Sequence, residues 1–176
     1  MDGAVNNRPG PAFYPKQMCT PKKALPMTKL KAGDKAPQFK GIDQDGQTLS
    51  LDDFKGHKLV LYFYPKDSTP GCTSQACNLR DNYDMLLEKG YKVVGVSADS
   101  EKSHKRFIEK NNLPFPLIAD TEKEILEAYG VWGLKKFMGR EFMGIIRTTF
   151  VISEDGTILE VIDKVKTKDH TAQIIG

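Results

Sequence analysis

Two cysteines, Cys72 and Cys77, lie close together at the start of a predicted helix, within the segment PKDSTPGCTSQACNLR. Pro70 suits the first helical position, because that position needs no N–H donor. Thr69 then becomes the N-cap, and we expect its hydroxyl to accept a backbone N–H of the first turn. Cys72 therefore falls within that turn, where unpaired N–H groups and the helix dipole favour a thiolate, which is a nucleophile at neutral pH.

We expect the sulfur of Cys72 to be accessible, since Pro70 and Gly71 keep side-chain bulk away from it. The alternative interpretation is a buried and inert cysteine, which is the common fate of a free thiol. The Thr-Pro-Gly sequence counts against that alternative, because a cysteine used only for packing does not require it.

Cys77 follows on the same helix, within an expected core-facing stripe of Ala76, Leu79, Tyr83 and Leu86. Taken alone, Cys77 reads as a core residue. In an intact helix the Cα atoms of the two cysteines would lie about 8 to 9 Å apart, beyond the limit of roughly 7 Å for a disulfide. The spacing also differs from Cys-x-x-Cys. It predicts a cycle in which Cys72 reacts while the helix is whole, and the first turns then unwind so that Cys77 can reach it.

The elements that must position these cysteines alternate between strands and helices. Asp45-Gly46 predicts a hairpin turn between strands 39–42 and 48–51, and the apolar run 58–64 predicts a central strand covered on both faces. The other expected elements are a helix over 70–89, a strand over 92–96, a helix from 100, a strand over 117–119, a helix over 122–129, a hairpin of 148–152 with 157–162, and a final helix. This order predicts an α/β thioredoxin-like fold with an N-terminal β-hairpin, a central mixed sheet and helices on both faces.

The length of 176 residues and the 39% hydrophobic content suit one compact domain, which we expect over residues 27–176. Residues 1–26 hold five of the ten prolines without a periodic apolar pattern, so we expect a disordered extension or an upstream segment. Cys19 lies in it and is expected to be an incidental exposed thiol with no catalytic role.

Charge and composition argue against several classes of protein. The net charge of +3 comes from 26 basic and 23 acidic residues mixed along the chain, so no basic face for nucleic acid is indicated. Three cysteines are too few for a disulfide scaffold. The sequence shows no membrane-spanning run and no secretory signal, which predicts a cytoplasmic location. His57, His104 and His170 lack metal-ligand spacing, and no metal or organic cofactor is expected.

The segment around Cys72 resembles the peroxiredoxin active site, in which a proline, three residues, threonine or serine, and two residues precede the cysteine. Here these positions are Pro65, Thr69 and Cys72. From Met27 onward, further motifs resemble the bacterioferritin-comigratory or Q-type subgroup. These motifs are TPGCTSQAC at 69–77, LRDN at 79–82, GVWG at 130–133, FMG at 137–139 and GIIR at 144–147.

The resemblance implies that Cys72 is the peroxidatic cysteine, that Thr69 and Arg147 hold substrate and thiolate, and that Cys77 is the resolving cysteine. It further implies reduction of hydrogen peroxide and organic hydroperoxides as antioxidant defence, recycling by thioredoxin, and a monomer, with a dimer left open. The residues around Arg147 independently support a role beside the thiolate, because a cation in an apolar strand needs an anionic partner. The alternative is an arginine whose head reaches solvent.

Two other functions are compatible with the same fold in this chain. A general thiol-disulfide oxidoreductase is disfavoured by the cysteine spacing, and a redox-sensing or chaperone-like module would use the disulfide as a switch. A group of apolar residues between positions 132 and 143 has three possible interpretations: one wall of the active-site entrance, a partner surface, or part of the core. They are Trp132, Phe137, Met138, Phe142 and Met143.

Overall fold

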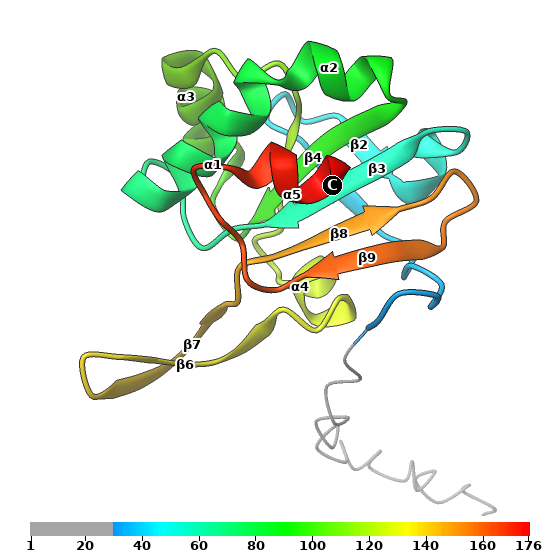
Figure 1. The fold of residues 1–176 in the computed structure, drawn as a ribbon. Coiled ribbons are helices and arrows are strands. Elements are labelled where there is room, and N and C mark those ends of the chain that lie inside the picture. The colour runs from blue at the N-terminus through cyan, green and yellow to red at the C-terminus, as the bar shows by residue number, and fades with distance from the viewer. Residues whose placement is uncertain (1–29) are drawn as a thin grey trace, which may run out of the picture.

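A five-stranded mixed sheet forms the centre of the computed structural model, which describes residues 30–176 (Figure 1). The predicted extension over residues 1–26, with Cys19, lies outside the described residues. The strand order is β5-β4-β3-β8-β9. The three strands β3 (Lys58–Phe63), β4 (Tyr91–Ser97) and β5 (Leu117–Ala119) run parallel. Strand β8 (Thr148–Ile152) pairs antiparallel with β3, and β9 (Ile158–Ile162) pairs antiparallel with β8.

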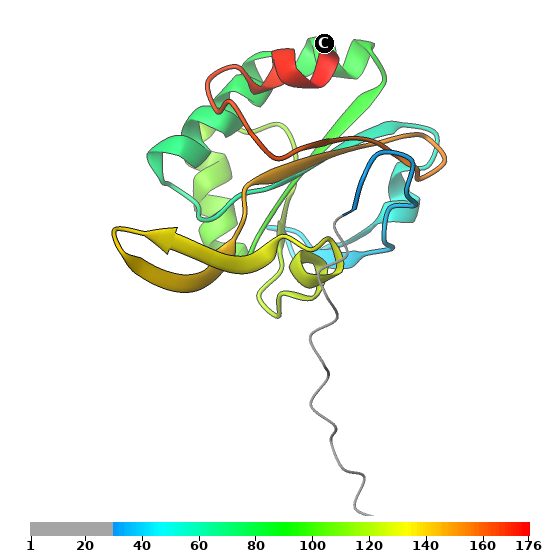
Figure 2. The same ribbon diagram turned by 60° about the horizontal axis from the view of Figure 1, so that its bottom comes forward.

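Helices cover both faces of this sheet (Figures 1 and 2). On one face lie α1 (Pro70–Asp81), α2 (Tyr83–Glu88), α3 (Glu101–Asn111) and α5 (His170–Ile175). On the other face lie α4 (Glu124–Ala128), the short helix η1 (Leu51–Phe54), and the hairpin of β1 (Lys40–Ile42) and β2 (Thr48–Ser50). The predicted thioredoxin-like α/β arrangement is confirmed. Within residues 30–176, every helix is too short or too polar to cross a membrane.

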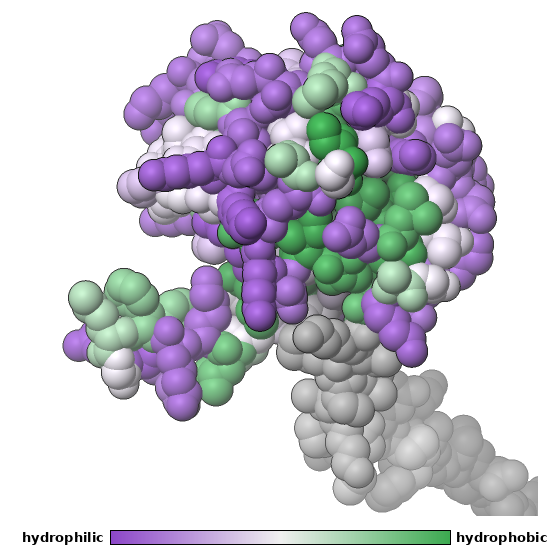
Figure 3. All heavy atoms as spheres, viewed as in Figure 1, coloured by the Kyte–Doolittle hydropathy of each residue, from purple (hydrophilic) through white to green (hydrophobic). Residues whose placement is uncertain are grey.

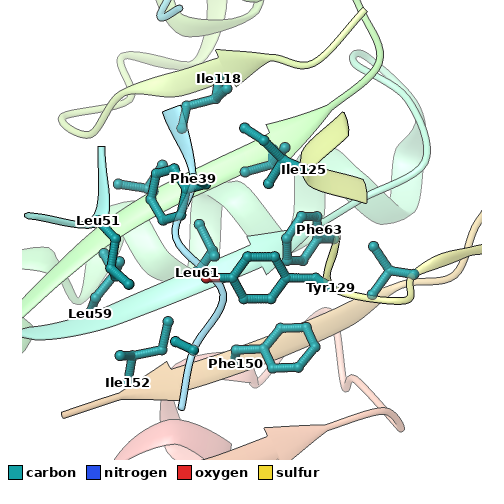
Figure 4. Close-up of a cluster of buried hydrophobic side chains, with 14 of the residues drawn as sticks. Phe39, Leu51, Leu59, Leu61, Phe63, Ile118, Ile125, Tyr129, Phe150 and Ile152 are labelled. Atoms are coloured by element: carbon teal, nitrogen blue, oxygen red, sulfur yellow. The ribbon is translucent and has the colours of Figure 1, made fainter. Parts of the chain in front are cut away.

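Strand β3 supplies apolar side chains to both faces, as its unbroken apolar sequence predicts. Leu59, Leu61 and Phe63 point into the cluster shown in Figure 4. Val60 and Tyr62 point into the opposite cluster, beneath α1. Because successive side chains of a strand alternate between faces, a strand covered on both sides must be apolar throughout. Because β3 is packed between two apolar clusters, its C-terminal end is held in place, and the loop to α1 begins at that end.

The helix predicted over residues 70–89 is divided into α1 and α2 at Asn82, whose φ of −108° and ψ of 11° depart from helical values. The side-chain Nδ2 of Asn82 donates to the carbonyl oxygen of Asn78 at 2.8 Å. Such local side-chain hydrogen bonds compete with the helical pattern. The break lies after Cys77, so both cysteines share α1.

A hairpin that the sequence did not predict extends away from the sheet (Figures 1 and 2). It consists of β6 (Trp132–Phe137) and β7 (Arg140–Ile145). Met138 and Gly139 join the strands with φ of 50° and 75°, as a turn of mirror-image type requires. The core interpretation is wrong for four of its apolar residues, which are exposed (Figure 3): Phe137, Met138, Phe142 and Met143. Trp132, the fifth residue of the apolar group defined from the sequence, is partly buried against the core.

Candidate active site

Cys72 lies in the first turn of α1, where the sequence places it. Thr69 is the N-cap and Pro70 is the first helical residue. Cys72 is only 2% exposed, so the expectation of an accessible sulfur is wrong for the intact helix. Both Cys72 and Cys77 are free thiols. The site therefore presents a buried thiol at the positive end of a helix of 12 residues.

Thr69 has the extended backbone of an N-cap, but its hydroxyl does not make the predicted bond to the helix. Instead Oγ1 donates to the carbonyl oxygen of Lys66 at 2.9 Å. The predicted capping hydrogen bond is thus wrong, because the hydroxyl closes the preceding loop. The first N–H with a helical acceptor belongs to Thr73, which donates to the carbonyl of Thr69 at 2.9 Å. The N–H groups of Gly71 and Cys72 precede it and have no acceptor within the helix.

Arg147, between β7 and β8, reaches the sulfur of Cys72. Its Nη2 donates to Sγ of Cys72 at 3.1 Å, and its Nη1 donates to Oε1 of Gln75 at 2.5 Å. The side chain therefore turns towards the thiol, and the solvent-directed alternative is wrong. A guanidinium at this distance favours a negative charge on the sulfur.

Gln75 is a site residue that sequence reasoning missed. It is fully buried and follows Cys72 by three positions on α1, so the two side chains share one helix face. Its Oε1 fixes one arm of the Arg147 guanidinium while the other arm contacts the sulfur. Its Nε2 has no hydrogen-bond partner within residues 30–176. The helical spacing from Cys72 was the available signal.

Gly71 lies close to the guanidinium of Arg147. A Cβ at this position would lie 3.4 Å from Nη2 of Arg147. Pro65, the remaining residue predicted for the site, is half-buried and begins the loop from β3 to α1.

Cys77 lies on the same helix but faces a different neighbour. Its Sγ is 3.8 Å from Oδ1 of Asn111 at the end of α3, and the residue is half-buried. Three residues of the predicted stripe, Ala76, Leu79 and Leu86, are fully buried, and the fourth, Tyr83, is partly buried against the same cluster. In this intact helix the two cysteines cannot bond, because their Cα atoms stand about 8 to 9 Å apart.

Lys135 of β6 brings a second cation to the site. Its Nζ donates to the carbonyl oxygen of Ile145 at 2.9 Å. Burial lowers the pKa of Lys135, the positive charge of Arg147 lowers it further, and the charge of Cys72 opposes the shift. The sequence could not reveal this residue, because the hairpin that carries it was not predicted.

A cluster of polar residues also gathers beside the β3–α1 loop. Ligand atoms of Asp67, Asp99 and His104 lie within 4.8 Å of one another, although their sequence spacing is not that of a metal site. Asp67 and His104 are buried and hydrogen-bonded to each other at 2.7 Å. The other histidines lie elsewhere: His57 is exposed, and His170 is buried against Thr149. We interpret the cluster as a hydrogen-bonded network.

A buried thiol at a helix N-terminus, contacted by an arginine on a thioredoxin-like sheet, defines a thiol-dependent redox enzyme. The AhpC/TSA family matches residues 32–161. Peroxiredoxin Bcp of Bacillus subtilis is 47% identical over 146 residues, which cover 83% of this chain and 93% of the relative. Peroxiredoxin Bcp of Escherichia coli K12 is 49% identical over 144 residues, which cover 82% of this chain and 92% of the relative.

A solved structure of a bacterioferritin comigratory protein is also similar to this chain. The bacterioferritin comigratory protein of Xanthomonas campestris, studied for alkyl peroxide reduction, has a TM-score of 0.73 and 35% identity, and the match covers 78% of this chain and 87% of that chain. The chain belongs to the AhpC/TSA family, among its peroxiredoxins of the bacterioferritin-comigratory type. The resemblance expected from the sequence motifs is confirmed.

Proposed function

We propose that Cys72 is the nucleophile with which this peroxiredoxin reduces hydroperoxides. The observation that carries the proposal is the 3.1 Å contact between Nη2 of Arg147 and Sγ of Cys72. This contact and the N-terminus of α1 both favour the thiolate, which is the reactive form of cysteine. The similarity to relatives named Peroxiredoxin Bcp supports the same chemistry.

In the first step the thiolate attacks the terminal oxygen of the hydroperoxide, the O–O bond breaks, and Cys72 becomes a sulfenic acid. The leaving oxygen takes up a proton and departs as water or an alcohol. Arg147 and the unpaired N–H groups of the first helical turn supply positive charge where the leaving oxygen becomes negative. Thr69 assists by keeping the loop before the helix closed.

In the second step Cys77 acts as the resolving cysteine. Its thiol attacks the sulfenic sulfur, which releases water and forms a Cys72–Cys77 disulfide. The step requires α1 to unwind, since the intact helix keeps the Cα atoms too far apart. A dithiol reductant, in our proposal thioredoxin, then restores both thiols by exchange.

The substrates we propose are hydrogen peroxide and organic hydroperoxides. The related Xanthomonas campestris protein is described by its alkyl peroxide reduction, and the low exposure of Cys72 favours substrates with a slim reactive end. We further propose that the enzyme works as a monomer in the cytoplasm, a compartment that supplies reduced dithiols.

The test follows NADPH consumption with thioredoxin, thioredoxin reductase and hydrogen peroxide. Sustained turnover should be abolished in Cys72→Ser and lost or strongly reduced in Cys77→Ser. Insulin reduction without peroxide would instead indicate a general thiol-disulfide oxidoreductase. Oxidation of Cys72 without turnover, with every peroxide and reductant tried, would indicate a redox switch and contradict the proposal.

A further inference from the structure

The loop that joins β3 to α1 is tied to the end of β4 by its backbone. Asp67, in the middle of this loop, is 5% exposed. Its N–H donates to Oδ2 of Asp99 at 2.8 Å, and the same oxygen accepts the hydroxyl of Ser97 at 2.8 Å. The position of the loop therefore depends on a carboxylate that is itself held in place.

The side chain of Asp67 makes three further hydrogen bonds. Oδ1 accepts the hydroxyl of Tyr64 at 2.6 Å, and Oδ2 accepts the hydroxyl of Ser103 at 2.8 Å and Nδ1 of His104 at 2.7 Å. Burial alone would raise the pKa of Asp67, but the hydrogen bond and charge of His104, with the bonds from Tyr64 and Ser103, lower it. Asp67 is therefore an ionised carboxylate at neutral pH.

His104 is fully buried in α3, and both of its ring nitrogens face acceptors. Nδ1 faces the carboxylate of Asp67, and Nε2 lies 3.0 Å from the carbonyl oxygen of Ile118 in β5. The Tyr64 hydroxyl also lies 3.3 Å from Nδ1. Asp67 and His104 thus form a buried, hydrogen-bonded pair, and removing either side chain would leave buried polar groups of the other without a partner.

The loop needs such an anchor because its backbone is strained. Ser68, directly after Asp67, has a φ of 61°, a left-handed conformation that is disfavoured for a residue with a side chain. Thr69 follows as the N-cap of α1, and Cys72 lies in the first turn. The contacts of Asp67 hold the strained loop, and the loop in turn places the start of the helix.

We propose that Asp67 and His104 are positioning residues that hold the folded active-site loop, and so set the balance between the intact α1 that reacts with peroxide and the unwound α1 that forms the Cys72–Cys77 disulfide. This inference rests on the proposed function of the two cysteines. Asp67 and His104 bond to each other, to Asp99 and to Ile118, whereas the Cys72 sulfur bonds to Arg147.

The balance can be measured, because two reactions compete for the Cys72 sulfenic acid. Attack by the Cys77 thiol gives the disulfide and water and requires the unwound helix. A second hydroperoxide instead oxidises the sulfenic acid to a sulfinic acid, releases water or an alcohol, and requires the folded site. Weakening the anchor should therefore slow the reaction with peroxide and protect Cys72 from overoxidation.

The experiment compares Asp67→Asn with the unmodified protein in the full chain. The rate constant for hydrogen peroxide is measured by competition, and the disulfide and sulfinic products are quantified by mass spectrometry across peroxide concentrations. We expect the rate constant to fall about tenfold, and the peroxide concentration that gives half overoxidation to rise by about tenfold, as the loss of one charged hydrogen bond would produce. Ser103→Ala, which removes one bond to Asp67, should shift both quantities less and in the same directions.

Asp43→Asn is the matched control, since Asp43 is also a buried aspartate. Its Oδ1 accepts the N–H groups of Asp45 and Gln47 at 2.9 Å in the β1–β2 turn, and its backbone, which the substitution keeps, pairs with Ile118. It should lower stability without changing the product ratio. An unchanged product ratio in both Asp67→Asn and Ser103→Ala, or a ratio equal to that of the control, would overturn the inference. Failure of the unmodified protein to form the disulfide would instead overturn the proposed function.

Discussion

Arg147 contacts the sulfur of Cys72 at 3.1 Å across 75 positions of sequence. Cys72 follows β3, in the parallel part of the sheet, and Arg147 precedes β8, in its antiparallel part. The contact therefore links these two parts of the sheet. These strands are neighbours, with Phe63 paired to Thr148 at the end nearest the site. The reactive charge pair is thus assembled where the two strands meet.

Replacing Arg147 tests the contribution of its charge. Arg147→Ala should lower the rate constant for hydrogen peroxide by about 100- to 1000-fold, the usual effect of removing a preorganised donor. Arg147→Lys should recover only part of the loss, because an ammonium cannot contact Cys72 and Gln75 as a fork. Competition kinetics supply the measurement. Arg140→Gln, at the exposed end of the hairpin, is the control, and an equal loss there would argue against a specific role for Arg147.

Gln75 should matter through the arginine it orients. Gln75→Leu leaves Nη1 of Arg147 without its acceptor, so we expect the rate constant for peroxide to fall about tenfold, equivalent to about 1.4 kcal/mol in the transition state. The same competition assay measures it. Gln47→Leu changes an exposed glutamine of the β1–β2 turn and should keep the original rate. An undiminished rate in Gln75→Leu would show that Arg147 needs no such support.

The sequence predicted those parts of the fold and site that depend on local pattern. The apolar run of β3 indicated a central strand, and Thr69-Pro70-Gly71 indicated the helix start that carries Cys72. Both depend on neighbouring residues, and both are confirmed. The bond made by the Thr69 hydroxyl was predicted wrongly, because it depends on the path of the loop at Lys66.

Long-range features could not be predicted in the same way. Asp67 and His104 are 37 positions apart, and neither lies in a pattern that indicates a buried hydrogen-bonded pair. The β6–β7 hairpin escaped prediction because its turn uses Met138 at positive φ, where asparagine, aspartate or glycine is the usual signal. Arg147 was predicted because a cation among apolar strand residues needs a partner, which is a chemical argument independent of distance.

The exposed apolar residues of the hairpin should contribute little to stability. Phe137 and Met138 are 65% and 88% exposed, so Phe137→Ser and Met138→Ser should change the free energy of unfolding by less than about 0.5 kcal/mol. Phe150→Ala, in the core cluster of Figure 4, should cost about 3 to 5 kcal/mol. Urea unfolding measures all three. A large loss of unfolding free energy in the two hairpin variants would mean that the β6–β7 hairpin packs against the domain in solution.

His170 should make stability depend on pH, because it is buried in its neutral form. Its Nε2 lies 2.8 Å from the Thr149 hydroxyl and its Nδ1 lies 3.1 Å from Oε1 of Gln173. Burial lowers the pKa of His170, the charge of Arg147 lowers it further, and the bond to Gln173 opposes the shift.

In the unfolded chain a histidine has a pKa of about 6.5. The unfolded state therefore binds the proton first, and the contribution of His170 to stability is complete above that pH and declines as the pH falls towards the lowered folded value. Urea unfolding between about pH 7.5 and pH 5 should show a shallower decline in His170→Gln than in the unmodified protein. His57→Gln, which removes an exposed histidine, is the matched control. Equal slopes in His170→Gln and the unmodified protein would mean that His170 takes up its proton as readily in the folded chain as in the unfolded one.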